Sequence, residues 1–305
     1  MKKKIFLEGS GVRVVYPHID FFIDKIVKKE PFKYLKICHA LFDGIIGAYK
    51  DNLDDFKKLL LAEDYEAIGK RMVESKTSDI EMGRSFWHGT TNDLTSQYVT
   101  AIKVLHQNKN LSDNIIVSVS LGVGLGTFWG VWDHMHRIQE GRRIVMGMLD
   151  SSTYHNYHYA GSFKHYTIKN EIYKLFYTLN QYDYNVGFFG PTYFSRFKDV
   201  FNIRNFTHLE IPVKNASENL EGEIERIRQF AKTSDKQSIV FLQCGATMAC
   251  TIIDVLKDEN ITIIDAGRSF DLLLKNELEQ HDTMWECWTG LDYDGLVNYV
   301  DKARE

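Results

Sequence analysis

The last third of the chain alternates short apolar runs with segments of helical periodicity, and no other feature constrains the fold as strongly. Uninterrupted apolar runs that end at glycine, proline or aspartate indicate buried strands. We predict strands at residues 185–189, 208–213, 238–242 and 261–264, and helices at 193–201, from 215 onward, at 247–256 and at 269–279. Strands joined by helices of this length pair in parallel through right-handed crossovers. The pattern therefore predicts an α/β fold with a Rossmann-like, mostly parallel sheet flanked by helices.

The first half of the chain is more helical and less regular. We expect strands at 32–38, 114–120 and 142–149, and helices at 54–76 and 96–106. A length of 305 residues with 44% hydrophobic side chains suits one large domain or two closely packed ones. We therefore divide the chain into a mostly helical N-terminal region, 1–110, packed on a Rossmann-like α/β core, 111–305.

Charge and composition narrow the class of protein. The formal net charge is −4, whereas a dedicated nucleic-acid binder usually carries a strong basic excess. The four cysteines have no CxxC spacing, which favours free thiols in a reducing compartment. The apolar run at 5–7 stops at Glu8, too short for a secretory signal, and no stretch approaches the roughly 18 apolar residues of a membrane span. We expect a cytoplasmic protein with no membrane span.

A glycine-rich segment follows the strand expected at 114–120. Gly122, Gly124 and Gly126 alternate with other residues ahead of a helix-like stretch at 128–138. Such glycines let backbone N–H groups approach a phosphate at a helix N-terminus, but they also serve tight turns with positive φ. The spacing is GxGxG rather than GxGxxG, and no acidic residue ends a strand about 20 positions on. Both interpretations stay open, and the first would suit a Rossmann methyltransferase or oxidoreductase.

Histidines recur from residue 134 onward without the spacing of a metal site. His134 and His136 are two positions apart, so on a helix they point in different directions and do not bind one metal ion together. Tyr154, His155 and His158 lie in a stretch of polar aromatic residues. We interpret this stretch as the lining of a pocket.

Two neighbouring strands of the predicted sheet end in segments suited to ligand binding. Gly245-Ala246-Thr247 follows one strand, and Asp265-Ala266-Gly267 closes the next. Ligands of open parallel sheets bind outside the carboxyl ends of the strands, where exposed turns and helix N-termini meet. Their position therefore favours a ligand site, although an aspartate close to a glycine also forms simple turns.

In order, these pieces resemble the glycosyltransferases of the GT-D fold type, which act on nucleotide sugars. Those proteins have a strand ending in a Gly-Pro-Thr-Ala-like turn, a helix, and a strand ending in Asp-x-Gly-His. The counterparts here run from Gly245 to Thr247 and from Asp265 to Arg268. A proline before an Asn-Ala pair is matched by Pro212 and Asn215-Ala216, although Asn215 also has the capping-box spacing with Glu218. The resemblance covers residues 185–275 and is weak over the first half.

The family's N-terminal signature is Gly-Asp-Gly-Glu, whose Asp-x-Glu acids hold a divalent metal at the sugar diphosphate. Its counterpart here is Phe42-Asp43-Gly44-Ile45, which we expect at the end of the strand at 32–38, so Asp43 keeps one acid and Ile45 replaces the other. A single carboxylate is a poor Mg²⁺ or Mn²⁺ site unless phosphates and waters complete the octahedron. Two further positions depart from the family, since Arg268 replaces its histidine and Ala246 its proline. An arginine can bind a diphosphate through paired N–H groups.

The resemblance implies a glycosyltransferase that moves a sugar from a nucleotide-sugar donor to a glycan, a protein or a modified nucleic acid. It implies Asp43 and Asp265 as catalytic residues, with Mn²⁺ or Mg²⁺ held at Asp43. The implied donor-binding residues are Gly44, Gly190, Thr192, Asn215, Gly245, Ala246, Thr247, Gly267 and Arg268, and the implied acceptor pocket is Tyr154, His155 and His158. The missing second acid leaves open a non-catalytic nucleotide or sugar-phosphate binding protein of the same fold.

Overall fold

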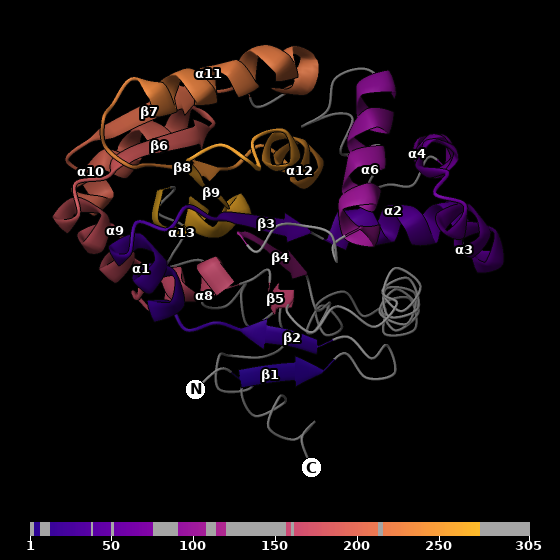
Figure 1. Ribbon diagram of the computed structural model, residues 1–305, viewed down its shortest axis with the longest axis horizontal. Helices are drawn as coiled ribbons and strands as arrows, with labels where there is room; N and C mark the ends of the chain where they lie inside the picture. The colour runs from indigo at the N-terminus through magenta and orange to yellow at the C-terminus, as the bar shows by residue number, and fades with distance from the viewer. Residues whose placement is uncertain are drawn as a thin grey trace.

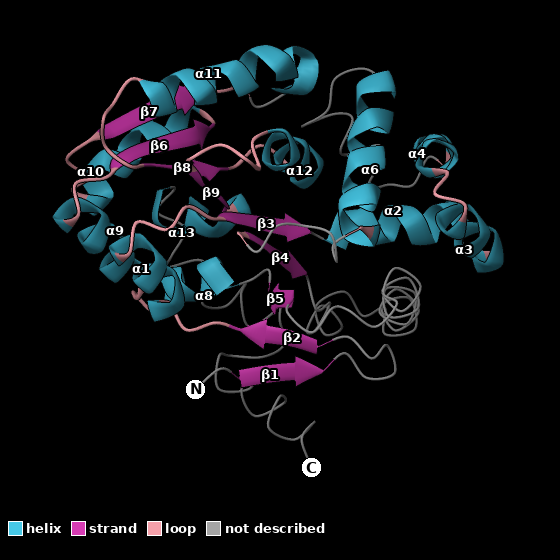
Figure 2. Ribbon diagram, viewed as in Figure 1, coloured by secondary structure: helices cyan, strands magenta, loops and turns pink. Residues whose placement is uncertain are grey.

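A computed structural model describes residues 3–6, 13–37, 39–49, 52–75, 91–107, 114–119, 157–159, 162–212 and 216–274. These residues form one nine-stranded sheet. Figure 2 shows helices on both sides of it. None of the helices in these ranges combines the length and the apolar character that a bilayer crossing requires.

The sheet has the order β1-β2-β5-β4-β3-β9-β8-β6-β7, and every neighbouring pair is parallel except β1 with β2. The strands are β1 (Lys3–Phe6), β2 (Arg13–Tyr16), β3 (Lys33–Ile37), β4 (Ile115–Val119), β5 (Tyr157–Tyr159), β6 (Asn185–Gly190), β7 (Phe206–Glu210), β8 (Ser238–Leu242) and β9 (Thr262–Asp265). Parallel strands covered on both faces are near-continuous apolar runs, and β8 is buried at every position. The sheet crosses the expected boundary at residue 110, because β3 lies between β4 and β9. That boundary stays a prediction.

Helices cover both faces of the sheet. The α-helices are α1 (Asp20–Val27), α2 (His39–Tyr49), α3 (Leu53–Leu61), α4 (Tyr65–Glu74), α6 (Thr91–His106), α8 (Ser162–Ile168), α9 (Ile172–Gln181), α10 (Phe197–Phe201), α11 (Leu220–Lys232), α12 (Ala246–Val255) and α13 (Asp271–Leu274). Short 3₁₀ helices are η2 (Thr192–Arg196), η3 (Ala216–Asn219) and η4 (Gly267–Phe270).

Successive side chains of β3 enter different cores, because side chains alternate between the two faces along a strand. Leu35 packs in a core with α2, α3, α4, α6, α11 and α12, and these helices define the α12 face. Tyr34 packs in a core with α1, α8, α9, α10, α13, η2 and η4, and these define the α9 face. In Figure 1, α6 and α12 lie on one side of the strands and α1, α8 and α9 on the other.

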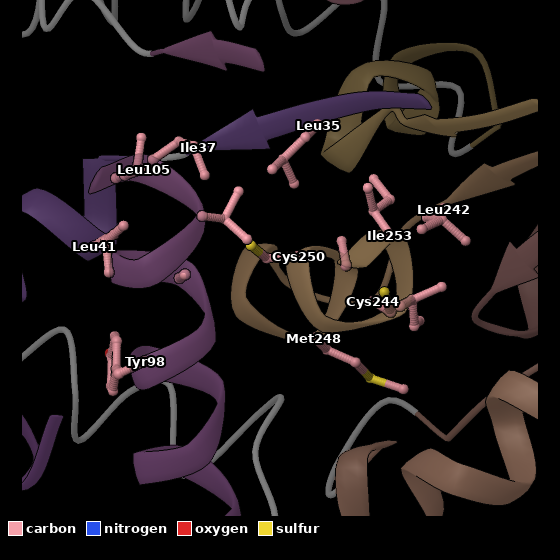
Figure 3. Packing of buried hydrophobic residues seen from close by; sticks show 14 of the residues in the cluster. Leu35, Ile37, Leu41, Tyr98, Leu105, Leu242, Cys244, Met248, Cys250 and Ile253 are labelled. Atoms are coloured by element: carbon pink, nitrogen blue, oxygen red, sulfur yellow. The ribbon is translucent and has the colours of Figure 1, made fainter. Parts of the chain in front are cut away.

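The two cores differ in chemistry. The α12 core is mainly aliphatic, and Figure 3 shows Leu35 of β3, Leu105 of α6 and Cys250 of α12 in one cluster. The α9 core is aromatic, with Phe188 of β6 stacked on Phe241 of β8 at a centroid distance of 5.0 Å. Aromatic pairs of this kind stabilise by about 0.5–1.5 kcal/mol beyond the area that they bury. Packing on both faces holds the strand ends in fixed positions.

The predicted α/β fold with a mostly parallel sheet and a more helical first half is confirmed. The strands expected at 32–38, 114–120, 185–189, 238–242 and 261–264 all form. The strand expected at 208–213 instead ends at Glu210, because Pro212 has no N–H for the ladder. The long helix expected from 215 begins at Leu220, after η3. The strand expected at 142–149 lies outside the described residues.

Candidate functional site

The carboxyl ends of β3, β9, β8 and β6 form one edge of the sheet. Asp265 of β9 pairs in register with Leu242 of β8, which pairs with Phe189 of β6. The chain leaves β8 into α12 on the α12 face and leaves β9 into η4 on the α9 face. Neighbouring strands whose connections leave to opposite faces open a crevice between them, and ligands bind there in open α/β sheets. We call these strand ends the carboxyl edge.

Asp265 is buried at this edge, with only 3% of its surface exposed. Its Oδ1 accepts a hydrogen bond of 3.0 Å from the N–H of Gly267, while Oδ2 has no hydrogen-bond partner among the described residues. Burial raises the pKa of the carboxyl to about 7, against the opposing effects of the Lys36 ammonium and the N–H groups of Gly267 and Lys36. A carboxyl that titrates near neutral pH is suited to exchange a proton with a substrate.

Lys36 brings a positive charge to Asp265 from the neighbouring strand β3. A Cβ on Gly267 would lie 2.9 Å from Lys36 Nζ, so the ammonium reaches the turn directly after β9. Gly267 has φ of +50°, a conformation that costs other residues energy. This glycine therefore permits both the turn and the close approach of the ammonium. The sequence reasoning missed Lys36, although the two lysines, Lys33 and Lys36, within the strand expected at 32–38 were a usable signal.

A second polar group lies at the same edge on the α9 face. Asp271 is buried, and its Oδ1 accepts hydrogen bonds of 3.0 Å from the Tyr193 hydroxyl and from Gln243 Nε2. Its Oδ2 accepts a hydrogen bond of 2.7 Å from Arg268 Nε. Burial, followed by the charge of Asp271, raises the pKa of Tyr193, which keeps its hydroxyl a donor. We call Tyr193, Gln243, Arg268 and Asp271 the Asp271 cluster; only Arg268 was predicted from the sequence.

Arg268 is held by this cluster while most of its side chain stays in solvent. Its side chain is 65% exposed, and the carboxylate of Asp271 beside it is almost fully buried. A guanidinium fixed through Nε by a buried carboxylate loses less conformational entropy when it binds an anion. The predicted residues Asp265 and Arg268 therefore share the carboxyl edge.

Gly245 and Thr247 reach the same edge at the start of α12. Gly245 precedes the helix with φ of 88° and ψ of 144°, a conformation suited to glycine. The first N–H groups of a helix have no partner within it and carry partial positive charge, so this end of α12 favours an anion. The Thr247 hydroxyl, however, donates to Gln97 Oε1 of α6 at 2.9 Å, and so serves to hold α12 against α6. Ala246 is the first residue of α12.

The other predicted donor residues have different surroundings. Gly190 ends β6, and a side chain there would overlap the ring of Phe194. Thr192 is exposed, and its hydroxyl donates to the carboxylate of Glu210. Asp43 and Gly44 lie within α2 rather than at the end of β3, and Asn215 lies outside the described residues.

Part of the predicted acceptor pocket lies outside the residues that the structure describes. His158 belongs to β5, whose carboxyl end shares the carboxyl edge two strands away from β3. Tyr154, His155, His134 and His136 lie outside the described residues, as does the glycine segment at 122–126.

Two cysteines at this side of the sheet are free thiols in the core. Cys244 and Cys250 are both fully buried. Burial raises the pKa of both thiols, so they stay protonated and do not act as nucleophiles.

The described residues do not provide a ligand set for Mn²⁺ or Mg²⁺. Within them, no three His, Cys, Asp or Glu side chains come close enough together to hold an ion. Ile45, at the position of the family's glutamate, is fully buried in the α12 core. At Asp265 the neighbouring cation is the Lys36 ammonium. A metal at Asp43 therefore stays a proposal.

A cavity of about 260 Å³ lies at the opposite, amino edge of the sheet. Its lining includes Lys232 at the end of α11, Gln237 before β8 and Asn260 before β9. It is thus separated from Asp265 by the length of the strands. This distance makes its residues suitable controls for tests of the carboxyl edge.

The fold that places these groups together is a glycosyltransferase fold. Two solved structures are similar to this chain, each covering 90% of it and 83% of their own length. One is a selenomethionine-substituted structure of domain of unknown function 1792, with a TM-score of 0.53 and 14% identity. The other, with a TM-score of 0.50 and 13% identity, is described in the words "the highly conserved domain of unknown function 1792 has a distinct glycosyltransferase fold". No family model and no curated protein sequence matches the chain. The predicted resemblance to GT-D glycosyltransferases is confirmed for the fold.

Proposed function

We propose that this chain is a glycosyltransferase that takes its sugar from a nucleotide-sugar donor bound at the carboxyl edge. The observation that carries the proposal is the buried Asp265 carboxyl, with one oxygen lacking a hydrogen bond and the Lys36 ammonium beside it. A buried carboxyl beside an ammonium group, at the place where open sheets bind ligands, supports a functional role over a structural one.

The donor diphosphate is the group for which this edge supplies positive charge. When the bond between the sugar carbon and the phosphate oxygen breaks, its electron pair leaves with the nucleoside diphosphate. Cations and helix N-termini aimed at that charge lower the barrier. Lys36, the exposed Arg268 and the N-terminus of α12 after Gly245 supply them in this proposal.

The acceptor loses a proton as its oxygen forms the new bond to the sugar carbon. Asp265 is the proposed base, because its pKa of about 7 allows it to take a proton near neutral pH. Asp43 is the other proposed catalytic acid, either as base or as holder of Mn²⁺ or Mg²⁺. Tyr154, His155 and His158 are the proposed acceptor pocket, and the glycan, protein or nucleic acid that enters it is open.

A specific observation also supports a second function, that of a non-catalytic nucleotide or sugar-phosphate binding protein. The position of the family's second metal ligand is Ile45, which is buried in the core and offers no oxygen. Lys36 and Arg268 would bind the phosphate groups of the ligand in such a protein as well as in an enzyme.

Release of free UDP or GDP from a panel of nucleotide sugars separates the two functions. We expect the wild-type chain to release nucleotide, and Asp265→Asn to lower that rate at least tenfold while still binding the donor, because the base is lost. Addition of Mn²⁺ or Mg²⁺, with Asp43→Asn as the matched variant, tests the metal.

Tight binding without any release would establish the binding protein instead. Thermal stabilisation by S-adenosylmethionine or NAD(H), and by no nucleotide sugar, would favour a methyltransferase or an oxidoreductase acting through the segment at 122–126.

A further inference from the structure

Gln243 carries an amide whose orientation is fixed by its neighbours. It follows β8 directly, is 3% exposed, and its backbone N–H donates to the carbonyl of Phe189 at 2.8 Å. Its Nε2 lies 3.0 Å from Asp271 Oδ1 and 2.7 Å from the Tyr193 hydroxyl. A carboxylate only accepts hydrogen bonds, so the amide nitrogen must face Asp271. The amide oxygen therefore points away from the carboxylate.

That oxygen, Gln243 Oε1, is buried and has no hydrogen-bond partner among the described residues. A buried acceptor without a donor costs about 1–3 kcal/mol, and native proteins contain few of them. Turning the amide over would satisfy Oε1 only by placing it against the carboxylate of Asp271. The cluster thus keeps an acceptor in place at the carboxyl edge, and a bound ligand that donates a hydrogen bond would remove the cost.

We propose that Gln243 Oε1 accepts a hydrogen bond from a hydroxyl group of the nucleotide sugar. This inference rests on the proposed function. Phosphate oxygens do not fit, because an ionised phosphate only accepts and the nearby Asp271 carboxylate repels it. A sugar hydroxyl donates and is neutral. Leu242, the residue before Gln243, pairs with Asp265, so this hydroxyl subsite lies at the same carboxyl edge as the proposed base, on the α9 face of the sheet.

Asp271 joins the two halves of the donor site. One of its oxygens orients Gln243 and the other holds Arg268. A single buried carboxylate therefore positions the acceptor for a hydroxyl and the cation for the diphosphate. In this assignment Gln243 is a binding residue, and Asp271 is a positioning residue.

Calorimetric titration with a donor tests the subsite. The variant is Gln243→Met, which keeps the length of the side chain and removes the acceptor. The control is Gln237→Met, the same substitution before β8, where the Gln237 amide contacts Asn260 at the amino edge. The ligands are free UDP, free GDP, and the UDP-sugars and GDP-sugars that bind the wild-type chain.

We expect Gln243→Met to weaken donor binding about tenfold, which corresponds to about 1.4 kcal/mol, and Gln237→Met to leave it within about twofold. A loss confined to nucleotide sugars assigns the hydroxyl to the transferred sugar. An equal loss with free UDP or GDP assigns it to the ribose.

Unchanged binding of both ligand classes by Gln243→Met, with the wild-type chain binding normally, would overturn the inference and leave the proposed function standing. Absence of binding by the wild-type chain would count against the proposed function itself. Should Gln243→Met fail to fold by circular dichroism, Gln243→Asn withdraws the same oxygen by one carbon and is expected to show the same loss.

Discussion

Asp265 combines a carboxyl group, complete burial and a neighbouring ammonium, and each has a separate effect on its chemistry. Burial disfavours the charged form, while Lys36 and the N–H groups at the turn favour it. Burial dominates, so the carboxyl titrates near pH 7 rather than near its usual value. A residue kept in this state lowers the stability of the folded chain, which is typical of functional groups.

The pH dependence of stability tests this description of Asp265. Unfolded aspartate titrates near pH 4, so between there and about pH 7 the folded chain holds a proton that the unfolded chain has released. Stability therefore falls as pH rises through this window. We expect Asp265→Asn, which has no charge to desolvate, to gain about 2–3 kcal/mol more over wild type at about pH 8 than at about pH 5. Urea unfolding at both pH values measures the gain, and an equal gain at both would show that the folded pKa is not raised.

Among the elements, α12 is held at the carboxyl edge by a polar contact as well as by apolar packing. Its apolar contacts with α6 and the sheet allow small shifts along the helix, whereas a hydrogen bond specifies one position. Thr247 supplies that bond to Gln97 in the first turn, close to Gly245. The direction of the helix N-terminus toward an anion therefore depends on a contact between α12 and α6.

Thr247→Val removes this hydroxyl without changing the size of the side chain. We expect a loss of about 1–3 kcal/mol in the free energy of unfolding, because the buried hydrogen bond from Thr247 to Gln97 is lost. Thr251→Val is the matched control, since its hydroxyl bonds within the same helix to the carbonyl of Thr247. The control is expected to cost less than about 0.5 kcal/mol. Equal losses by urea unfolding would contradict a special role for the α12–α6 contact.

Helices and strands could be predicted from the sequence where a single hydrophobic pattern ran through the whole element. β8 and β9 are short apolar runs buried on both faces, so periodicity alone identified them. Helix α9 went unnoticed because aromatic residues such as Tyr177 also lie on its exposed face, which weakens the contrast between its two faces in the sequence. Likewise Asp43 was expected at a strand end, but the helix α2 begins at His39 and places it inside a helix. Local pattern does not fix where a helix begins.

At the scale of the molecule, the carboxyl edge depends on strand order. Positions 245–247 and 265–268 were predicted to share an edge because their strands follow each other in sequence and both end there. Lys36 was not predicted, since nothing local indicates that β3 would pair with β9, more than 200 residues later. Gln243, Tyr193 and Asp271 were missed for the same reason, as their hydrogen bonds join three separate segments. The fold class could therefore be predicted from the hydrophobic pattern of the sequence. The site could not, because its residues come together only when distant strands pair.

The affinity of the chain for UDP and GDP tests the central claim, that the carboxyl edge binds a nucleoside diphosphate through Lys36 and Arg268. Titration calorimetry would compare wild type with Lys36→Met and Arg268→Ala, and with Lys232→Met as the matched control at the amino-edge cavity. We predict that each carboxyl-edge variant weakens binding about tenfold or more, because a charge-assisted contact is lost, and that Lys232→Met leaves it unchanged. Equal affinity in wild type and both carboxyl-edge variants, or a loss seen only with Lys232→Met, would contradict the account.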